Sequence, residues 1–147
     1  MAASAWMLFH GAKEKMCDGT FVLDSDTFNC ALMSSDWTPS LSGNAVWGDI
    51  SANEIADDYG YTAGGQALTS VTWTNSSGTM KFTSANPTWT ADGGAIAARY
   101  AVIYDVTDAG AGLLCYCLLD DTPADVTATS GNAFVIQMNA AGIFTLA

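Results

Sequence analysis

Basic residues are scarce in this chain. Its 147 residues include three Lys, one Arg and one His. Fifteen residues are Asp or Glu, so the formal net charge is −11. Binding to nucleic-acid phosphates or to anionic lipid depends on clustered cations. We therefore expect neither a nucleic acid nor a membrane surface as a partner.

Long apolar runs and catalytic motifs are also missing. No apolar run approaches the roughly 20 residues of a transmembrane helix. The N-terminal stretch MAASAWMLFHGAKEK places its lysines after its apolar run, the reverse of a secretory signal, so we expect synthesis in the cytoplasm. His10 is the single histidine and lies in the apolar part of the predicted helix, which favours a packed or capping role over a catalytic one, and GxSxG, HExxH and Walker patterns do not occur. We predict no enzyme activity and no cofactor, and a packing or capping role for His10.

The four cysteines, Cys17, Cys30, Cys115 and Cys117, form no CxxC pair, and one His leaves too few ligands for a zinc site. Cys115 and Cys117 are two apart in a strand-like run, so their side chains should share a face. We expect buried free thiols, with a Cys17–Cys30 disulfide as the alternative.

Aspartates occur as close pairs in turn-like segments: Asp24 and Asp26, Asp57 and Asp58, Asp120 and Asp121. Aspartate favours turns because its carboxylate accepts hydrogen bonds from its own local backbone. A calcium loop is the alternative, but DSDTFN lacks the glycine and the closing glutamate of that motif. We therefore predict turn chemistry and no metal.

Half of the residues are hydrophobic and 13% are charged, which is typical of one folded domain spanning 1–147. Amphipathic spacing predicts a helix over 3–17 that ends near Gly19. Residues 34–58, rich in Ser, Pro, Gly and Asn, indicate a long surface loop with one helical turn near SANEIADD. Alternating or apolar runs predict strands at 20–23, 28–33, 66–74, 78–84, 87–90, 97–106, 112–120, 133–139 and 142–147.

Three pairs of these strands, 20–23 with 28–33, 66–74 with 78–84, and 133–139 with 142–147, flank turn signals and are predicted hairpins. The apolar runs at 97–106 and 112–120 are typical of central strands that are covered on both faces. The predicted fold is all-β, mainly an antiparallel sandwich or barrel, with one short N-terminal helix.

Aromatic residues in and after the long loop are candidates for an interface: Trp37, Trp47, Tyr59 and Tyr61. Exposed loop aromatics commonly anchor protein partners. Trp73 and Trp89 lie in predicted strands, where a core position is expected. A sugar-binding face built from the same aromatics is the alternative interpretation.

Arg99 lies at the start of the predicted strand 97–106, directly after the turn-like ADGG. A guanidinium there can bind a carboxylate while its stem lies on apolar surface. We predict a structural ion pair between Arg99 and Asp92, with a contact to another subunit as the alternative.

Several segments resemble small virion structural proteins of tailed bacteriophages. They are GTFVLDSDTFNCALMSS, EIADDYGYTAGGQALTSVTWT, NPTWTADGGAIAARYAVIYD and SGNAFVIQMNAAGIFTLA, and GYTAGGQAL and ARYAVIYD carry most of the resemblance, which covers roughly residues 9–147. The resemblance implies a non-enzymatic component of the virion, with no catalytic residues.

A small β-rich chain of this kind suits a capsid decoration or cement protein, which binds the major capsid protein at the capsid surface and stabilises the head. Many copies would favour a homo-oligomer, with a trimer at a capsid threefold axis. A tail, head–tail connector or head-fibre component is the first alternative. A carbohydrate-binding β-sandwich module is the second.

Overall fold

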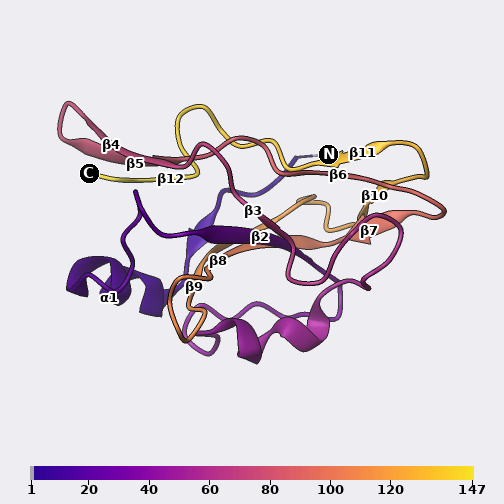
Figure 1. Cartoon of the computed structure of the whole chain (residues 1–147), viewed down its shortest axis with the longest axis horizontal. Helices are drawn as coiled ribbons and strands as arrows, with labels where there is room; N and C mark the ends of the chain where they lie inside the picture. The colour runs from indigo at the N-terminus through magenta and orange to yellow at the C-terminus, as the bar shows by residue number, and fades with distance from the viewer. Residues whose placement is uncertain (1) are drawn as a thin grey trace.

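A computed structural model describes residues 2–147, and antiparallel sheets dominate it (Figure 1). The all-β prediction with one short helix is confirmed. The helical elements are α1 (His10–Asp18) and two 3₁₀ turns, η1 (Trp47–Asp49) and η2 (Ser51–Asn53). The strands are β1 (Met7–Leu8), β2 (Phe28–Met33), β3 (Gln66–Ala67), β4 (Thr72–Ser76), β5 (Thr79–Thr83), β6 (Thr88–Thr90), β7 (Ile96–Ala98), β8 (Tyr100–Asp105), β9 (Leu113–Leu118), β10 (Val126–Ala128), β11 (Ala133–Val135) and β12 (Phe144–Leu146).

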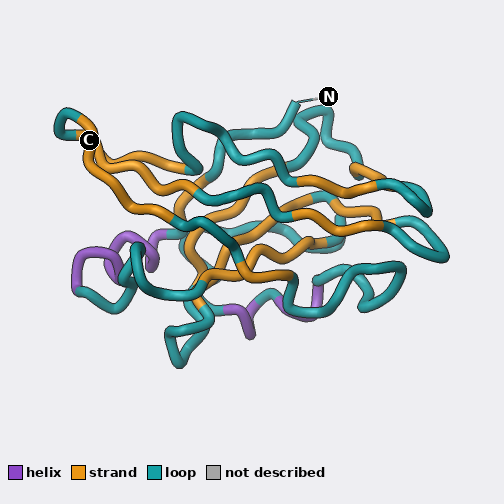
Figure 2. The backbone as a smooth tube through the Cα atoms, turned by 45° about the horizontal axis from the view of Figure 1, so that its top comes forward, coloured by secondary structure: helices purple, strands orange, loops and turns teal. Residues whose placement is uncertain are grey.

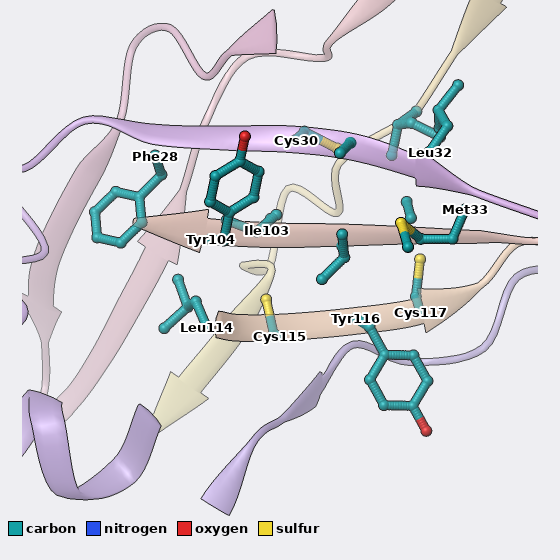
Figure 3. Close-up of a cluster of buried hydrophobic side chains, with 14 of the residues drawn as sticks. Phe28, Cys30, Leu32, Met33, Ile103, Tyr104, Leu114, Cys115, Tyr116 and Cys117 are labelled. Carbon is teal, nitrogen blue, oxygen red and sulfur yellow. The ribbon is translucent and has the colours of Figure 1, made fainter. Parts of the chain in front are cut away.

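The core is built on a five-stranded sheet in the order β1-β9-β8-β2-β3. Its three long strands, β2, β8 and β9, are almost wholly buried, as their apolar runs predict. Cys30 lies opposite Ile103, which lies opposite Cys115, so these three side chains share one face of the sheet (Figure 3). Cys117 follows Cys115 by two residues on that face, and both are buried, which confirms their predicted common orientation.

A second layer covers this face and contains two smaller sheets, β12-β5-β4 and β11-β6, whereas a third, β10-β7, lies at the end of the central sheet, where β7 continues into β8. Figure 1 shows β4, β5, β12, β6 and β11 running along one side of the central strands. Phe82 of β5 joins the layers: its ring centroid is 5.5 Å from that of Phe28 and 5.2 Å from that of Phe144. Phe134 of β11 packs edge-on against Trp89 of β6.

The opposite face of the central sheet is covered by the segment 34–58, which lies below β2 and β8 in Figure 1 and contains the helical turns near the lower edge of Figure 2. It is therefore only partly a surface loop. Trp37 and Ile50 are buried, and single bridges tie Glu54 to Met33 and Val46 to Gly112. The predicted helical turn near SANEIADD corresponds to η2.

The N-terminal helix is shorter than predicted. Residues 3–9 are not helical, and Met7 and Leu8 pair with Tyr116 and Cys115 of β9. This pairing satisfies their backbone groups in the sheet, which overrides the amphipathic spacing that favours a helix. Gly19 ends the helix with a left-handed φ of 84°, as predicted.

Two of the three predicted hairpins are wrong. Residues 20–23 form no strand, because Asp26 accepts a hydrogen bond from the Val22 amide and folds the segment into a turn. In the C-terminal region, β11 pairs with β6 and β12 pairs with β5. The two strands separate because Phe134 and Phe144 pack on different aromatic partners, Trp89 and Phe82.

The hairpin of β4 and β5 is confirmed. Its two-residue turn has positive φ at Ser77 (52°) and Gly78 (88°), as a type I′ turn requires. The predicted strand 97–106 is instead two strands, β7 and β8, divided at Arg99. The Arg99 amide donates to the Met33 carbonyl and its carbonyl accepts from Leu119, so the backbone stays bonded across the break.

Candidate interaction surface

The aromatic residues predicted as an interface do not form one surface. Trp37 is 4% exposed, and its ring centroid lies 5.3 Å from Tyr100 and 5.4 Å from Tyr116. Tyr61 is also buried: its hydroxyl accepts from the Leu32 amide and donates to Glu54. Both belong to the core, so their prediction as surface anchors is wrong.

Trp47 and Tyr59 lie nearer the surface. Trp47 is half-buried and stacks on Tyr104, with ring centroids 4.3 Å apart and planes 10° from parallel. Tyr59 is 46% exposed, at a left-handed φ of 51°. Tyr104 thus covers one ring face of Trp47.

Arg99 forms an ion pair, but with a different partner from the predicted Asp92. Its Nε lies 2.7 Å from Oδ1 of Asp125, in the segment before β10. Because β10 pairs with β7, the antiparallel register brings Asp125 to the break between β7 and β8. Asp92 is exposed, and its amide donates to the Tyr59 carbonyl.

Turn chemistry is confirmed for Asp26 and Asp120. Asp120 accepts from the amide and hydroxyl of Thr122, and these hydrogen bonds lower the pKa of its carboxyl.

Within residues 2–147, no three His, Cys, Asp or Glu side chains are placed to hold a metal ion. No helix in that range is long and apolar enough to cross a bilayer. His10 is exposed as the first residue of α1, so its predicted packing role is wrong, and Phe9 rather than His10 holds the N-cap position.

All four cysteines are free, and the alternative Cys17–Cys30 disulfide is not formed. Cys30, Cys115 and Cys117 are buried, which raises the pKa of each thiol and leaves it protonated at neutral pH. Cys17 was also predicted to be a buried thiol, and this is wrong, because it is exposed on α1.

Cys17 lines an apolar cleft of about 510 Å³ between α1 and the β12-β5-β4 sheet, which we call the α1 cleft. Lys13, Met16 and Cys17 of α1 form one wall together with the turn after the helix, and the sheet forms the other. Its lining residues are Leu8, Lys13, Met16, Cys17, Phe21, Val22, Leu23, Asp24, Trp73, Met80 and Leu146.

The sheet wall of the cleft follows from strand register. Leu146 lies opposite Met80, and both are two residues from the pair Phe144 and Phe82, so all four share a face. Phe82 and Phe144 pack in the core, whereas Met80 is half-buried and Leu146 is 53% exposed. The sheet thus continues past the core and carries apolar side chains over α1. The alternation of apolar residues at 80, 82, 144 and 146 was the sequence signal that could have indicated this cleft.

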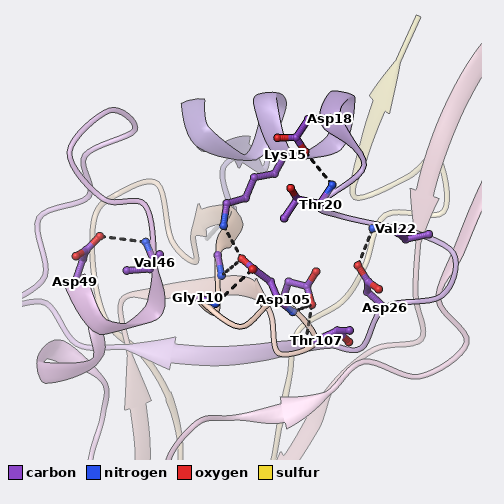
Figure 4. Close-up of polar contacts among 12 residues, drawn as sticks. Lys15, Asp18, Thr20, Val22, Asp26, Val46, Asp49, Asp105, Thr107 and Gly110 are labelled. Atoms are coloured by element: carbon purple, nitrogen blue, oxygen red, sulfur yellow. Dashed lines mark hydrogen bonds and ion pairs between the residues drawn. The ribbon is translucent and has the colours of Figure 1, made fainter.

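The turn wall is held by polar contacts beneath it (Figure 4). Oδ2 of Asp26 accepts from the Val22 amide at 2.6 Å. Lys15 forms an ion pair with Asp108, which lowers the pKa of that carboxyl, and its Nζ lies 5.3 Å from the Phe21 ring centroid. These contacts fix Phe21 and Val22 at the edge of the cleft.

Asp105 lies behind the same turn and is completely buried. Its Oδ1 accepts from the amides of Thr107 and Asp108, whereas Oδ2 has no hydrogen-bond donor within residues 2–147. Burial raises its pKa to about 6, and the adjacent Asp26 carboxylate adds to this effect. Asp105 is therefore protonated more readily than an exposed aspartate.

A second groove of about 600 Å³ adjoins the α1 cleft and runs between β1 and β12, with Leu8 and Lys13 common to both. Trp6, Leu41 and Ile143 add apolar surface there. The N-terminal segment, α1 and the C-terminal strand therefore share one largely apolar region of the surface.

No protein-family model, curated protein or solved structure matches this chain.

Proposed function

We propose that this chain is a small structural protein of a tailed-bacteriophage virion, and specifically a capsid decoration protein that binds the major capsid protein and stabilises the head. The sequence resemblance supports the virion assignment. The observation that carries the binding role is the α1 cleft, an apolar recess on a compact β-scaffold with a net charge of −11. Apolar recesses that stay open to solvent commonly serve as binding sites.

The charge of the chain defines the chemistry of its target. Four basic residues cannot balance fifteen acidic ones, so complementary capsid surface would be neutral or basic around the apolar contact. In the proposed role the protein is made in the host cytoplasm and then added to the capsid surface, as a homo-oligomer with a trimer favoured.

The test is quantitative mass spectrometry of purified virions that carry this protein, with its copy number measured against the major capsid protein. A decoration protein occurs in a fixed ratio to capsid subunits, in many copies. Virions that lack it should lose their DNA at a lower temperature than complete virions. A few copies per particle would overturn the decoration role and favour the tail, connector or head-fibre alternative, which cryo-electron microscopy would then locate.

A further inference from the structure

Two sheets end at the second groove. β1 is the outer strand of the β1-β9-β8-β2-β3 sheet, and β12 is the outer strand of the β12-β5-β4 sheet. Residues 5–8 line the groove from the first edge and residues 143–145 line it from the second, so we call it the β1–β12 groove. Within residues 2–147, β1 pairs with β9 alone and β12 pairs with β5 alone, so both strands keep a free edge.

The register of the β12-β5-β4 sheet determines which backbone groups lie on the free edge of β12. The two-residue turn makes Ser76 and Thr79 the first hydrogen-bonded pair of the β4–β5 hairpin, so residues 79, 81 and 83 bond to β4. Residues 80 and 82 therefore bond to β12, at Leu146 and Phe144. Thr145 lies between these two, so its N–H and C=O point away from β5.

The free edge of β1 follows from the same alternation. The Phe9 amide donates to the Leu114 carbonyl, and Met7 is paired with Tyr116 two residues along each strand. Leu8 lies between these bonded pairs, so its N–H and C=O point away from β9. Neither Leu8 nor Thr145 has another backbone hydrogen-bond partner within residues 2–147. Unpaired strand edges of this kind are templates for a further strand.

The side chains that line the groove are mostly apolar. Trp6, Leu41 and Ile143 contribute apolar surface, and no acidic residue lines the groove within residues 2–147. Lys13 is the one charged residue of this lining, and it forms no ion pair with another described residue. An occupant with apolar side chains and a carboxylate near Lys13 is therefore complementary to the groove.

These features identify the kind of occupant. A helix bonds its backbone groups internally and leaves none for a strand edge, whereas an extended segment keeps them free. A second copy of the chain would offer the same edges around a two-fold axis, where β12 has three residues and each copy carries a net charge of −11. The fitting occupant is an extended segment of another protein.

We propose that the β1–β12 groove binds an extended segment of a partner protein, which adds a strand to the free edge of β12, covers the apolar lining with alternate side chains and places a carboxylate near Lys13. This is recognition by β-strand addition. The inference goes beyond the proposed function, because it holds whether the partner is a capsid protein or another protein.

The probe is a synthetic peptide of about eight residues that alternates Val with Thr and carries one Glu near its middle. Three matched peptides are N-methylated at every residue, have their Val residues in one block, or carry Lys in place of Glu. Binding to the full chain is measured by calorimetry. We expect the N-methylated and block peptides to bind at least about tenfold more weakly than the probe. The Lys peptide should bind about threefold more weakly.

Amide hydrogen exchange, followed by NMR, locates the bound peptide. The amide of Thr145 should exchange fast in the free chain, and the probe should slow this exchange at least about tenfold. The amide of Asn75 is the matched control, because it points away from β5 on the opposite edge of the same sheet. Its exchange should stay unchanged.

Two variants at one exposed position test the backbone contact. Thr145→Pro removes the free N–H, whereas Thr145→Val keeps it on a side chain of similar size; an edge strand tolerates Pro where the N–H makes no ladder bond. We expect Thr145→Pro to weaken binding of the probe about tenfold and Thr145→Val to change it less than about twofold. Lys13→Gln should abolish the preference for Glu over Lys in the peptide. Circular dichroism confirms that each variant is folded.

Equal binding of the N-methylated peptide and the probe would overturn the inference, as would unchanged exchange of the Thr145 amide in the complex or no binding of the probe. These measurements use the unaltered chain, so they decide the matter even if Thr145→Pro fails to fold. A preference for Glu that survives Lys13→Gln would overturn the carboxylate contact. Self-association of the chain that the probe disrupts, seen by sedimentation, would overturn the choice of partner and assign the groove to a second copy.

Discussion

Asp105→Asn should stabilise this protein above neutral pH. The carboxyl of Asp105 is completely buried and faces Asp26, and its Oδ2 has no donor within residues 2–147 (Figure 4). The nearby charged residues Lys15 and Asp108 form an ion pair with each other. An Asn at position 105 can still accept from the amides of Thr107 and Asp108 through its carbonyl, while its NH₂ group can donate to Asp26.

The sign and the size of the effect follow from proton linkage. Burial raises the pKa of Asp105 from 3.8 to about 6, so the folded chain binds this proton more tightly than the unfolded chain. The resulting stabilisation is complete below pH 3.8 and is lost as the pH rises through about 6. A shift of this size corresponds to at most about 3 kcal/mol. The coupling to Asp26 and relaxation of the turn reduce it, so we expect a loss of about 1–3 kcal/mol.

Asn at position 105 does not titrate, so the variant keeps the stability that the wild type loses as the pH rises. Urea unfolding of both proteins between pH 4 and pH 8 should give equal free energies of unfolding near pH 4. The variant should be more stable by about 1–3 kcal/mol near pH 7.5. Glu54, whose pKa is also raised by burial, is present in both proteins and cancels in the difference.

The matched control is Asp36→Asn, which removes the same charge from an exposed aspartate. It should shift the free energy of unfolding by less than about 0.5 kcal/mol across the same pH range. If Asp105→Asn destabilised the protein by the same amount at every pH, or left the difference independent of pH, the account of a buried carboxyl with a raised pKa would be refuted.

Arg99→Ala should lower the free energy of unfolding by less than about 1 kcal/mol in thermal melts, because the side chain of its partner Asp125 is 43% exposed, and Asp92→Ala should have no effect. Gly65→Ala should prevent stable folding or cost more than about 3 kcal/mol by circular dichroism, because Gly65 has a φ of 74° and an added Cβ would collide with the carbonyl of Cys30. A thiol reagent should modify one cysteine of the native chain, Cys17, and all four after unfolding in urea, as counted by mass spectrometry; modification of a second cysteine in the native state would contradict the buried positions.

Patterns that depend on neighbours in the sequence predicted the fold best. The apolar runs of β2, β8 and β9 indicated buried central strands, and a positive-φ turn at Ser77 and Gly78 joined β4 to β5 as expected. The secondary-structure predictions that failed did so because strands paired with distant parts of the chain. Residues 3–9 have the apolar spacing of a helix, yet β9 offers their backbone a ladder, and pairing with a distant strand is invisible to local periodicity.

The candidate site was harder to predict because exposure is a property of the whole fold. Trp37 lies in a segment rich in Ser and Pro, which favoured an exposed position, but the face of the central sheet that carries Tyr100 and Tyr116 had to be covered by something. The segment 34–58 covers it, and Trp37 became core. Conversely, Leu146 and Met80 lie in strands and would be assigned to the core, although the sheet that carries them extends beyond it.

The cleft and the buried carboxyl meet in one turn. Asp26 accepts from the amide of Val22, which lines the cleft, and its carboxylate also faces Asp105 behind the turn. The negative charge of Asp26 adds to the raised pKa of Asp105, so the protonated form of Asp105 removes a like-charge contact from this turn. One buried proton therefore stabilises the same carboxylate that holds the apolar wall in place. This gives a physical reason for a carboxyl in the core of a chain that already carries fifteen acidic residues.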